Sequence, residues 1–286
     1  MSEQIDTAIS WATDQLAAYS DSARLDAELL LAHCLNKPRS YLYTWPEKPL
    51  DFECSKKFAE LIEQRKKPTP IAYLLGAREF YSLDFISTAD ALVPRPETEL
   101  LVELTLEQIG ELDEFRVIDL GTGTGIIAVT LKHFRPGLEM WATDLDPACI
   151  KLARHNAEQH GVEINFITSN WFQALPDIRF DFIVSNPPYI AAEHPFLLQG
   201  DLPGEPSLAL TPGDTGTEAL QTIIEKAPLF LRPAGRILLE HGYDQQSAVA
   251  QLLQHNGFTE IRCHNDLNQL PRVTSAKLVE NPEIGG

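Results

Sequence analysis

The sequence has no long hydrophobic run and few of the features that mark secreted or metal-binding proteins. No apolar stretch approaches the ~20 residues that cross a membrane. The opening residues MSEQIDTAISWATDQ have neither the basic nor the apolar region of a signal peptide. Cys34, Cys54, Cys149 and Cys263 form no CxxC pair, and the eight histidines lack ligand spacing. We therefore expect a cytoplasmic protein with free thiols, no metal site and no membrane partner.

Basic residues are also scarce, because 23 Lys and Arg stand against 41 Asp and Glu, for a formal net charge of −18. So acidic a surface repels nucleic acid phosphates, whose binding normally depends on Lys and Arg. We therefore expect no direct nucleic acid binding and favour a protein or small-molecule partner, although a local basic patch remains compatible with this charge. A length of 286 residues with 44% hydrophobic residues is typical of a globular protein with one large domain or two.

Helical spacing of apolar residues dominates the first part of the chain. It appears in SARLDAELLLAHCLNK, with Ser22 as the expected N-cap, and again in FECSKKFAELIEQRKK. The next stretch, IAYLLGAREFYSLDFISTADALVPRP, alternates aromatic and polar residues around a glycine, which indicates a β-hairpin. We therefore predict a helical domain over 1–70, a β-hairpin linker over 71–92 and a further domain over 93–286.

The pattern changes to strand, turn and helix from about residue 96. The segments that read as strands are FRVIDL, LEMWATDLD, VEINFIT, FDFIVSN and RILLEH, with a closing pair around 258–263 and 273–280. Helices are expected at IIAVTLKHF, at PACIKLARHNAEQHG and near 216–231 and 244–256, and an irregular stretch lies over 190–213. Such alternation predicts an α/β fold, with a mainly parallel sheet covered by helices on both faces.

Two candidate ligand sites follow the first two strands of this sheet, at their carboxyl ends. The first is the turn in VIDLGTGTG, where glycines let the backbone approach a ligand at a helix N-terminus. It is neither the GxGxxG of nucleotide dehydrogenases nor a phosphate loop, and a plain tight turn is the alternative. The second is Asp144, at the place where an acidic side chain binds ribose hydroxyls. Because Asp146 before Pro147 is the better N-cap, we expect the Asp144 carboxylate to be free for a ligand.

A third candidate is IVSNPPYIAA, where a strand runs directly into Asn186, Pro187, Pro188 and Tyr189. The prolines end the strand and hold the chain stiff and extended. The Asn186 side-chain carbonyl and the Pro187 backbone carbonyl could accept two N–H bonds from a planar NH₂ group and direct its lone pair outward. Tyr189 could stack on such a group. The alternative is a rigid turn with Tyr189 as a core aromatic residue.

Together these features resemble class I methyltransferases that use S-adenosylmethionine to modify planar NH₂ groups. Further motifs, namely PIAYLLGAREF, LVPRPETELLVE, NWFQAL, SNPPYI and EPSLAL, are similar to those of peptide chain release factor glutamine methyltransferases. The resemblance covers most of the chain. It implies a Rossmann-like sheet of seven strands and methyl transfer to the side-chain amide nitrogen of the glutamine in the GGQ motif of a release factor. The helical N-terminal domain would then recognise that protein partner.

The resemblance also assigns roles to residues of this chain. It implies that S-adenosylmethionine is bound by Gly121, Thr122, Gly123, Thr124, Gly125, Asp144, Asn170, Trp171 and Asn186. It implies that the substrate glutamine is bound by Asn186, Pro187, Pro188 and Tyr189, of which Asn186, Pro187 and Tyr189 are catalytic. The family often has Asp where this chain has Asn170, and an amide oxygen could take over its contact with adenine at weaker affinity. Arg95 and Glu97 in PRPETE either border the pocket or form a salt bridge between domains.

Two other functions share parts of this pattern. A ribosomal-protein glutamine methyltransferase has the same core and differs only in its partner. A nucleic acid amino-methyltransferase shares the Asn-Pro-Pro-Tyr stretch, but the net charge of −18 and the lack of a basic, aromatic-rich segment argue against it.

Overall fold

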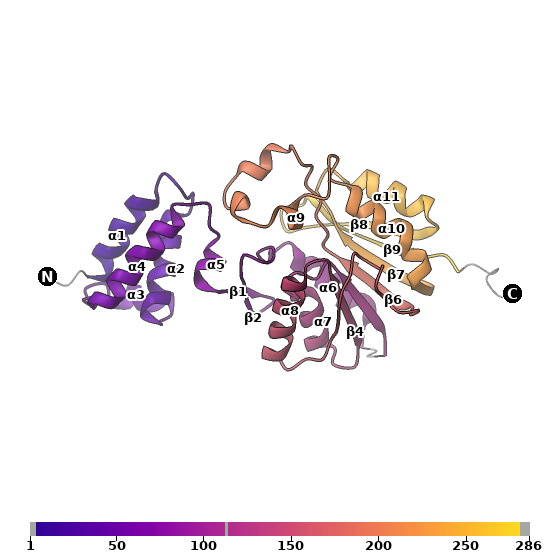
Figure 1. Ribbon diagram of the computed structural model, residues 1–286, viewed down its shortest axis with the longest axis horizontal. Coiled ribbons are helices and arrows are strands. Elements are labelled where there is room, and N and C mark those ends of the chain that lie inside the picture. Colours follow the sequence, from indigo (N-terminus) through magenta and orange to yellow (C-terminus); the bar gives the residue numbers. More distant parts are fainter. Residues whose placement is uncertain (1–3, 112–113, 281–286) are drawn as a thin grey trace. The chain divides into compact units, whose positions relative to one another are not determined.

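The computed structural model describes residues 4–111 and 114–280, which divide into two compact units (Figure 1). The first unit takes the described part of Met1–Arg78, together with Ser87–Ala89 and Pro195–Glu205. The second takes Glu79–Ile86, Asp90–His194 and the described part of Pro206–Gly286. The chain therefore leaves the second unit after His194 and returns to it at Pro206. No helix within 4–111 and 114–280 is long and apolar enough to cross a membrane.

The first unit is built from helices packed around an apolar core that includes Leu30, Phe58 and Ile62. Ser22 occupies the N-cap position of the second helix, but its hydroxyl donates to Asp26 Oδ1 at 2.9 Å and makes no cap hydrogen bond. The helices of this unit are α1 (Ile5–Leu16), α2 (Ala23–Leu35), α3 (Arg39–Thr44), α4 (Phe52–Arg65) and α5 (Ile71–Leu75), with short 3₁₀ turns at Pro195–Leu198 and Leu202–Gly204.

A buried ion cluster attaches the segment Pro195–Glu205 to these helices. Arg65 Nε lies 2.8 Å from Asp26 Oδ2, and Arg65 Nη1 lies 2.6 Å from Asp201 Oδ1. The Arg65 and Asp26 side chains are only 5% and 4% exposed. A Cβ on Gly204 would meet the backbone oxygen of Pro68 at 1.6 Å. The segment therefore packs closely against the end of α4 and the chain that follows it.

The predicted hairpin is shorter than expected. Ile71–Leu75 forms helix α5 instead, because Pro70 precedes it at the N-cap and Gly76, with φ of 74°, ends it in the left-handed conformation. The hairpin itself consists of β1 (Ala77–Phe80) and β2 (Leu83–Ile86). Its two turn residues, Tyr81 and Ser82, have φ of 53° and 61°, which is the backbone geometry of a tight type I′ turn.

A seven-stranded sheet forms the centre of the second unit, as the sequence predicted, in the order β5-β4-β3-β6-β7-β9-β8. The first five strands in that order run parallel, and β9 lies antiparallel between β7 and β8. The order reverses between β3 and β6, which is where open α/β sheets bind ligands. The strands are β3 (Arg116–Leu120), β4 (Glu139–Asp144), β5 (Asn165–Thr168), β6 (Phe180–Ser185), β7 (Leu231–Glu240), β8 (Phe258–Asn265) and β9 (Pro271–Leu278).

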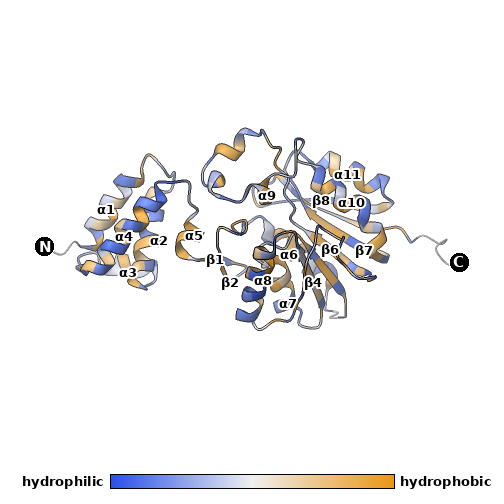
Figure 2. Ribbon diagram, in the orientation of Figure 1, coloured by the Kyte–Doolittle hydropathy of each residue, from blue (hydrophilic) through white to orange (hydrophobic). Residues whose placement is uncertain are grey.

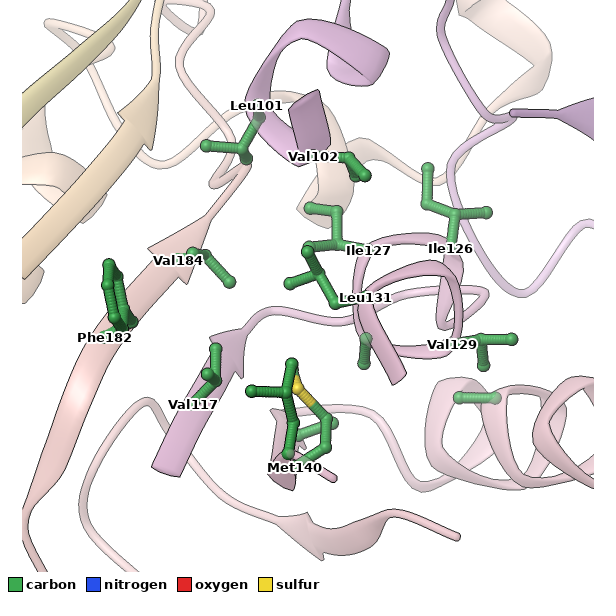
Figure 3. Close-up of a cluster of buried hydrophobic side chains, with 14 of the residues drawn as sticks. Leu101, Val102, Val117, Ile126, Ile127, Val129, Leu131, Met140, Phe182 and Val184 are labelled. Carbon is green, nitrogen blue, oxygen red and sulfur yellow. The ribbon is translucent and has the colours of Figure 1, made fainter. Parts of the chain in front are cut away.

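Alternate side chains of the central strands pack against helices on opposite faces of the sheet. Val117 and Val184 face one apolar cluster, where Ile127 and Leu131 point toward them (Figure 3). The neighbouring residues of both strands, such as Ile118, belong to a second cluster. Figure 2 shows polar and apolar residues mixed along the helices. The first face is covered by α6 (Thr98–Ile109), α7 (Ile126–Phe134) and α8 (Pro147–Gln159), and the second by α10 (Glu218–Phe230) and α11 (Gln246–His255).

Candidate active site

A cavity of about 370 Å³ lies in the second unit, at the carboxyl ends of β3, β4, β5 and β6. Its volume falls within the usual range of about 300–1,000 Å³ for small-molecule sites. The lining consists of residues 90–95, Thr98, 121–124, 126, 127, 144–146, Cys149, 169–171, Asn186, Pro188 and 206–209. The cavity therefore brings together nine of the twelve residues to which the resemblance assigns a binding role, together with Arg95, and leaves Gly125, Pro187 and Tyr189 outside its lining.

The glycine turn after β3 shapes one wall. Gly121 and Gly123 have φ of 72° and 54°, a conformation that side chains rarely adopt. A Cβ on Gly121 would also lie 3.3 Å from the Trp171 ring. Gly125 caps α7 and packs on α8, where its Cβ would lie 3.0 Å from that of Ala153. The first two glycines therefore open space beside the cavity, whereas Gly125 allows the close packing of two helices.

Asp144 is not left free, contrary to the expectation from the sequence. Its Oδ2 accepts a hydrogen bond from the Gly123 backbone at 2.9 Å, and its Oδ1 accepts one from the Asp146 backbone at 2.9 Å. Asp146 does cap α8, by accepting from the Ala148 backbone at 2.8 Å. Burial raises the pKa of Asp144, although these backbone donors oppose that effect. Each carboxylate oxygen has a second lone pair, so Asp144 can still accept hydrogen bonds from a ligand.

A second carboxyl, which the sequence analysis did not single out, lies beneath the glycine turn. Asp119 is fully buried in β3 and accepts a hydrogen bond from the Thr122 hydroxyl at 2.6 Å. Burial, with a smaller effect of the Asp144 charge, raises the pKa of Asp119 to about 7. Its Oδ1 has no hydrogen-bond partner among the described residues. Asp119 does not itself line the cavity, so the carboxyl that a ligand beside the glycine turn would meet is that of Asp144, which suits hydroxyl donors or positive charge.

The Asn-Pro-Pro-Tyr segment leaves β6 and forms another part of the wall through Asn186 and Pro188. Pro187 is buried. The Tyr189 ring packs against the second apolar cluster, and its hydroxyl donates to Glu240 Oε1 at 3.3 Å. Burial raises the pKa of Tyr189, so the hydroxyl keeps its proton. The half-buried ring therefore packs against the core and does not line the cavity, which is closer to the alternative that the sequence left open.

The end of this segment is held by the chain before α10 and by Gln245, which precedes α11. The backbone N–H of Ile190 donates to Leu210 at 3.0 Å, and Gln245 donates to the Tyr189 carbonyl at 2.9 Å. Gly216, with φ of 80°, lies so close that a Cβ would meet the Tyr189 oxygen at 2.7 Å. These contacts hold the chain at the carboxyl end of the Asn-Pro-Pro-Tyr segment.

Among the described residues, the cavity offers neither a reactive thiol nor a cluster of metal ligands. Burial raises the pKa of the Cys149 thiol, which lines the cavity, to about 12, so it is not a thiolate nucleophile at neutral pH. Within residues 4–111 and 114–280, no group of three or more His, Cys, Asp or Glu side chains could hold a metal ion. The arrangement is suited to positioning a reactive ligand.

Glu240 is a second buried carboxyl next to this site, and its charge should make stability depend on pH. Burial raises its pKa to about 7, against the charge of Arg272 and the hydrogen bond from Tyr189. Between about pH 5 and 7 the Glu240 carboxyl is therefore protonated in the folded protein and ionised in the unfolded chain. The free energy of unfolding of the wild-type protein should fall as pH rises through this range. Glu240→Gln, measured by urea unfolding, should gain stability relative to wild type by up to about 1.4 kcal/mol per pH unit over this window.

Above about pH 7 the difference in the free energy of unfolding between Glu240→Gln and wild type should level off. Glu158→Gln, on the exposed face of α8, serves as the control and should show no such trend. A Glu240→Gln difference that stays constant from pH 5 to 8 would show that the folded protein does not hold this proton.

Fold and cavity together define the class of protein: this is a methyltransferase of the class I fold. Residues 7–76 match the family described as "PrmC N-terminal domain", and residues 96–198 match "Methyltransferase small domain". The chain is 44% identical over 259 residues to a release factor glutamine methyltransferase of Xylella fastidiosa, which covers 90% of this chain and 94% of that protein. The chain therefore belongs to the release factor glutamine methyltransferase family, as its motifs indicated.

Solved structures agree on the fold. A methyltransferase from Pyrococcus furiosus aligns with a TM-score of 0.54 and 17% identity, over 70% of this chain and 91% of that one. A 16S rRNA methyltransferase of T. thermophilus, in complex with AdoMet and guanosine, aligns with a TM-score of 0.51 and 21% identity, over 71% of this chain and 49% of that one. At such identities the likeness concerns the fold alone.

Proposed function

We propose that the protein transfers a methyl group from S-adenosylmethionine to the side-chain amide nitrogen of a glutamine in a release factor, within the GGQ motif. The observation that carries the proposal is the Asn-Pro-Pro-Tyr segment, which presents Asn186 to the cavity beside the glycine turn. The relative named above is a release factor glutamine methyltransferase. The reaction would take place in the cytoplasm, where its protein substrate is made.

The cavity suits this methyl donor. S-adenosylmethionine, when bound, supplies a sulfonium methyl group that a nucleophile can displace. Gly121 and Gly123 leave space that a Cβ would fill, and the Asp144 carboxyl in the cavity wall favours a cation. We assign the methionine part to residues 121–124, the ribose hydroxyls to Asp144 and the adenine to Asn170 and Trp171, with Asn186 at the reacting end. Gly125 would serve the turn only through the packing of α7 on α8.

The residues at the reacting end would act by orientation. An amide nitrogen is a poor nucleophile because its lone pair is delocalised into the carbonyl group. The Asn186 side-chain carbonyl and the Pro187 backbone carbonyl would accept its two N–H bonds and direct the lone pair toward the methyl group. These two acceptors would also stabilise the positive charge on the nitrogen as it is methylated. The surplus proton of the methylated amide would pass to water.

Asp144→Ala should weaken binding of S-adenosylmethionine by ~1.5–3 kcal/mol, as expected when a hydrogen bond to a charged group is lost. Asp144→Asn, which keeps one acceptor oxygen, should fall between wild type and alanine. Titration calorimetry measures both, and melting temperatures show whether the variants remain folded. An alanine variant that is folded and binds with wild-type affinity would limit Asp144 to its backbone hydrogen bonds with Gly123 and Asp146.

Recognition of the protein substrate is assigned to the helical domain, residues 1–70, and the segment 71–92 serves as the linker to the catalytic domain. The catalytic domain, 93–286, would then hold only the glutamine side chain and the methyl donor. The helical unit carries exposed aromatic side chains at Tyr43 and Phe52, which are typical of protein–protein interfaces.

Labelled S-adenosylmethionine, incubated with the protein and a release factor, a ribosomal protein or duplex DNA, tests the proposal. We expect the release factor to be labelled, and we expect this label to be lost when the glutamine of its GGQ motif is replaced by alanine. Label on the ribosomal protein alone would point to the other glutamine methyltransferase. Label on DNA alone would overturn the assignment to a protein substrate.

A further inference from the structure

A second pocket, of about 610 Å³, lies in the helical unit. It is lined by the last turn of α2, by the chain that follows it as far as Pro38, and by Lys57 of α4. None of its lining residues belongs to the cavity at the edge of the sheet. The proposed methyl transfer therefore does not account for this pocket, and what it binds depends on its own side chains.

Positive charge collects in this pocket without an acidic partner. Lys37 and Lys57 both line it, and no lining residue is acidic. Neither lysine forms an ion pair with a carboxylate among the described residues, although Arg24 and Arg65 of the same unit do. In a protein with a net charge of −18, two uncompensated cations beside one pocket form a local positive site that attracts an anion.

The end of α2 does not require these lysines, although basic side chains often stabilise the negative end of a helix. Asn36 ends α2 with φ of 50°, in the left-handed conformation, and its backbone N–H donates to the carbonyls of Ala32 and His33. The backbone N–H of Lys37 donates to the Ala32 carbonyl at 3.0 Å. The helix end carries only about half a negative charge, so the two lysine side chains leave the pocket positive.

His33 holds the Lys57 side chain at the pocket. Lys57 Nζ lies 3.3 Å from His33 Nε2, and because an ammonium group can only donate, this ring nitrogen accepts and the ring is neutral. Burial, together with the charge of Lys57, lowers the pKa of His33, which favours that neutral form. Burial also raises the pKa of the Cys34 thiol in the lining to about 11, so no thiolate repels an anion at neutral pH. Lys57 is therefore preorganised and still has N–H donors for a ligand.

We propose that this pocket binds a carboxylate side chain of the protein substrate, and so docks an acidic residue of the release factor on the helical unit. A polyanion such as nucleic acid is disfavoured, because its charges extend along the acidic surface of a protein with a net charge of −18. A single carboxylate interacts mainly with charges within about 8–10 Å, since salt screens the more distant ones. The inference rests on the proposed function, because it concerns how the release factor is held away from the reacting glutamine.

Replacing both lysines by methionine removes the two charges and keeps an unbranched apolar side chain at each position. In steady-state assays with full-length release factor and saturating S-adenosylmethionine, Lys37→Met with Lys57→Met should raise KM for the release factor by about tenfold. The value of kcat should stay within about twofold of wild type, because the pocket contributes to docking and not to the chemical step. Lys56→Met, at an exposed lysine of α4 that does not line the pocket, is the matched control and should keep the wild-type KM. A double variant with the wild-type KM would overturn the inference.

An exchange of charges tests whether the bound anion is a carboxylate of the release factor. Lys57→Glu should raise KM further, because it places like charges against each other. When the acidic residues of the release factor are replaced by lysine one at a time, one replacement should lower the KM of Lys57→Glu again. Raising NaCl from about 0.05 to 0.5 M should reduce the difference in KM between Lys57→Glu and wild type, because salt screens exposed charges. If no replacement in the release factor restores the KM, the inference is wrong.

A short RNA duplex is the probe for the alternative ligand. We expect the wild-type protein to bind it no more tightly than the double lysine variant. If the double variant binds the duplex more weakly and keeps the wild-type KM for the release factor, the pocket takes phosphates and the inference is overturned.

The same assays separate this inference from the proposed function. If the wild-type protein methylates the release factor and the lysine variants keep its KM, only the docking pocket is wrong. If the wild-type protein does not methylate the release factor, the proposed function fails and the docking pocket fails with it. Calorimetry should show unchanged affinity for S-adenosylmethionine in each lysine variant, and a decrease that accompanies the raised KM would count against a role limited to docking.

Discussion

Replacing Asn186 with alanine should slow single-turnover methyl transfer by about 10²–10³, the usual effect of removing one preorganised hydrogen-bond partner of the transition state. Affinity for S-adenosylmethionine should change little, because the Asn186 carbonyl is assigned to the substrate glutamine. A quench-flow assay with excess enzyme measures the rate of the chemical step, and calorimetry measures cofactor binding. A slow variant with unchanged cofactor affinity would show that Asn186 acts on the substrate glutamine and not on cofactor binding.

Asn186→Asp is the sharper comparison, because a carboxylate still accepts hydrogen bonds and presents an oxygen on either branch. We expect it to retain more activity than alanine, provided that its added charge does not displace the cofactor. Asn268→Ala, in the exposed turn between β8 and β9, is the matched control and should react at the wild-type rate. Wild-type turnover of Asn186→Ala would reduce the Asn-Pro-Pro-Tyr stretch to a rigid turn.

Arg65→Met should destabilise the helical unit by about 3–5 kcal/mol, the cost of leaving a buried charge without its partner. Asp26, only 4% exposed, would lose its cation, and Asp201 would lose its contact with α4. Hydrogen exchange followed by mass spectrometry can measure α2 and α4 separately from the sheet. We expect faster exchange in those helices and in Pro195–Glu205.

Arg24→Met provides the control for Arg65, because Arg24 also forms a salt bridge, to Glu28, but its side chain is 70% exposed. Exposed ion pairs contribute about 0–1 kcal/mol, so exchange in α2 should hardly change. If the two substitutions increase the rate of hydrogen exchange equally, burial of the Arg65 cluster does not increase its contribution to stability.

The sheet was predictable because its signals are local. Strands such as FDFIVS end within two residues of a proline or glycine, and the Asp146–Pro147 pair marks the start of α8 by its own chemistry. The helix Ile71–Leu75 was not predicted, since its aromatic and apolar residues also fit a strand pattern. Its boundaries depend on Pro70 and Gly76, which also suit the ends of a hairpin.

The candidate site was predictable only in part. Asn186 and Asp144 each follow a strand, so their place at the edge of the sheet could be expected. The bond between Asp144 and the Gly123 backbone joins residues 21 positions apart, and the bond between Asn186 and Thr98 joins residues 88 positions apart. Such partners depend on how the strands pair, so neither the engagement of Asp144 nor the contact of Asn186 with Thr98 could be expected from the sequence.

Pro195–Glu205 belongs to the helical unit although it lies far from those helices in the sequence. This arrangement affects how the protein folds during its synthesis. Arg65 and Asp201 are 136 positions apart, so the helical unit lacks one of its buried contacts until most of the chain has left the ribosome. At about 5–20 residues per second, that delay is roughly 7–27 s. During this time Arg65 has only Asp26 as an anionic partner, and the surface that later receives the segment stays uncovered. Maturation of the amino-terminal helices should therefore wait for the last third of translation, even though they are synthesised first.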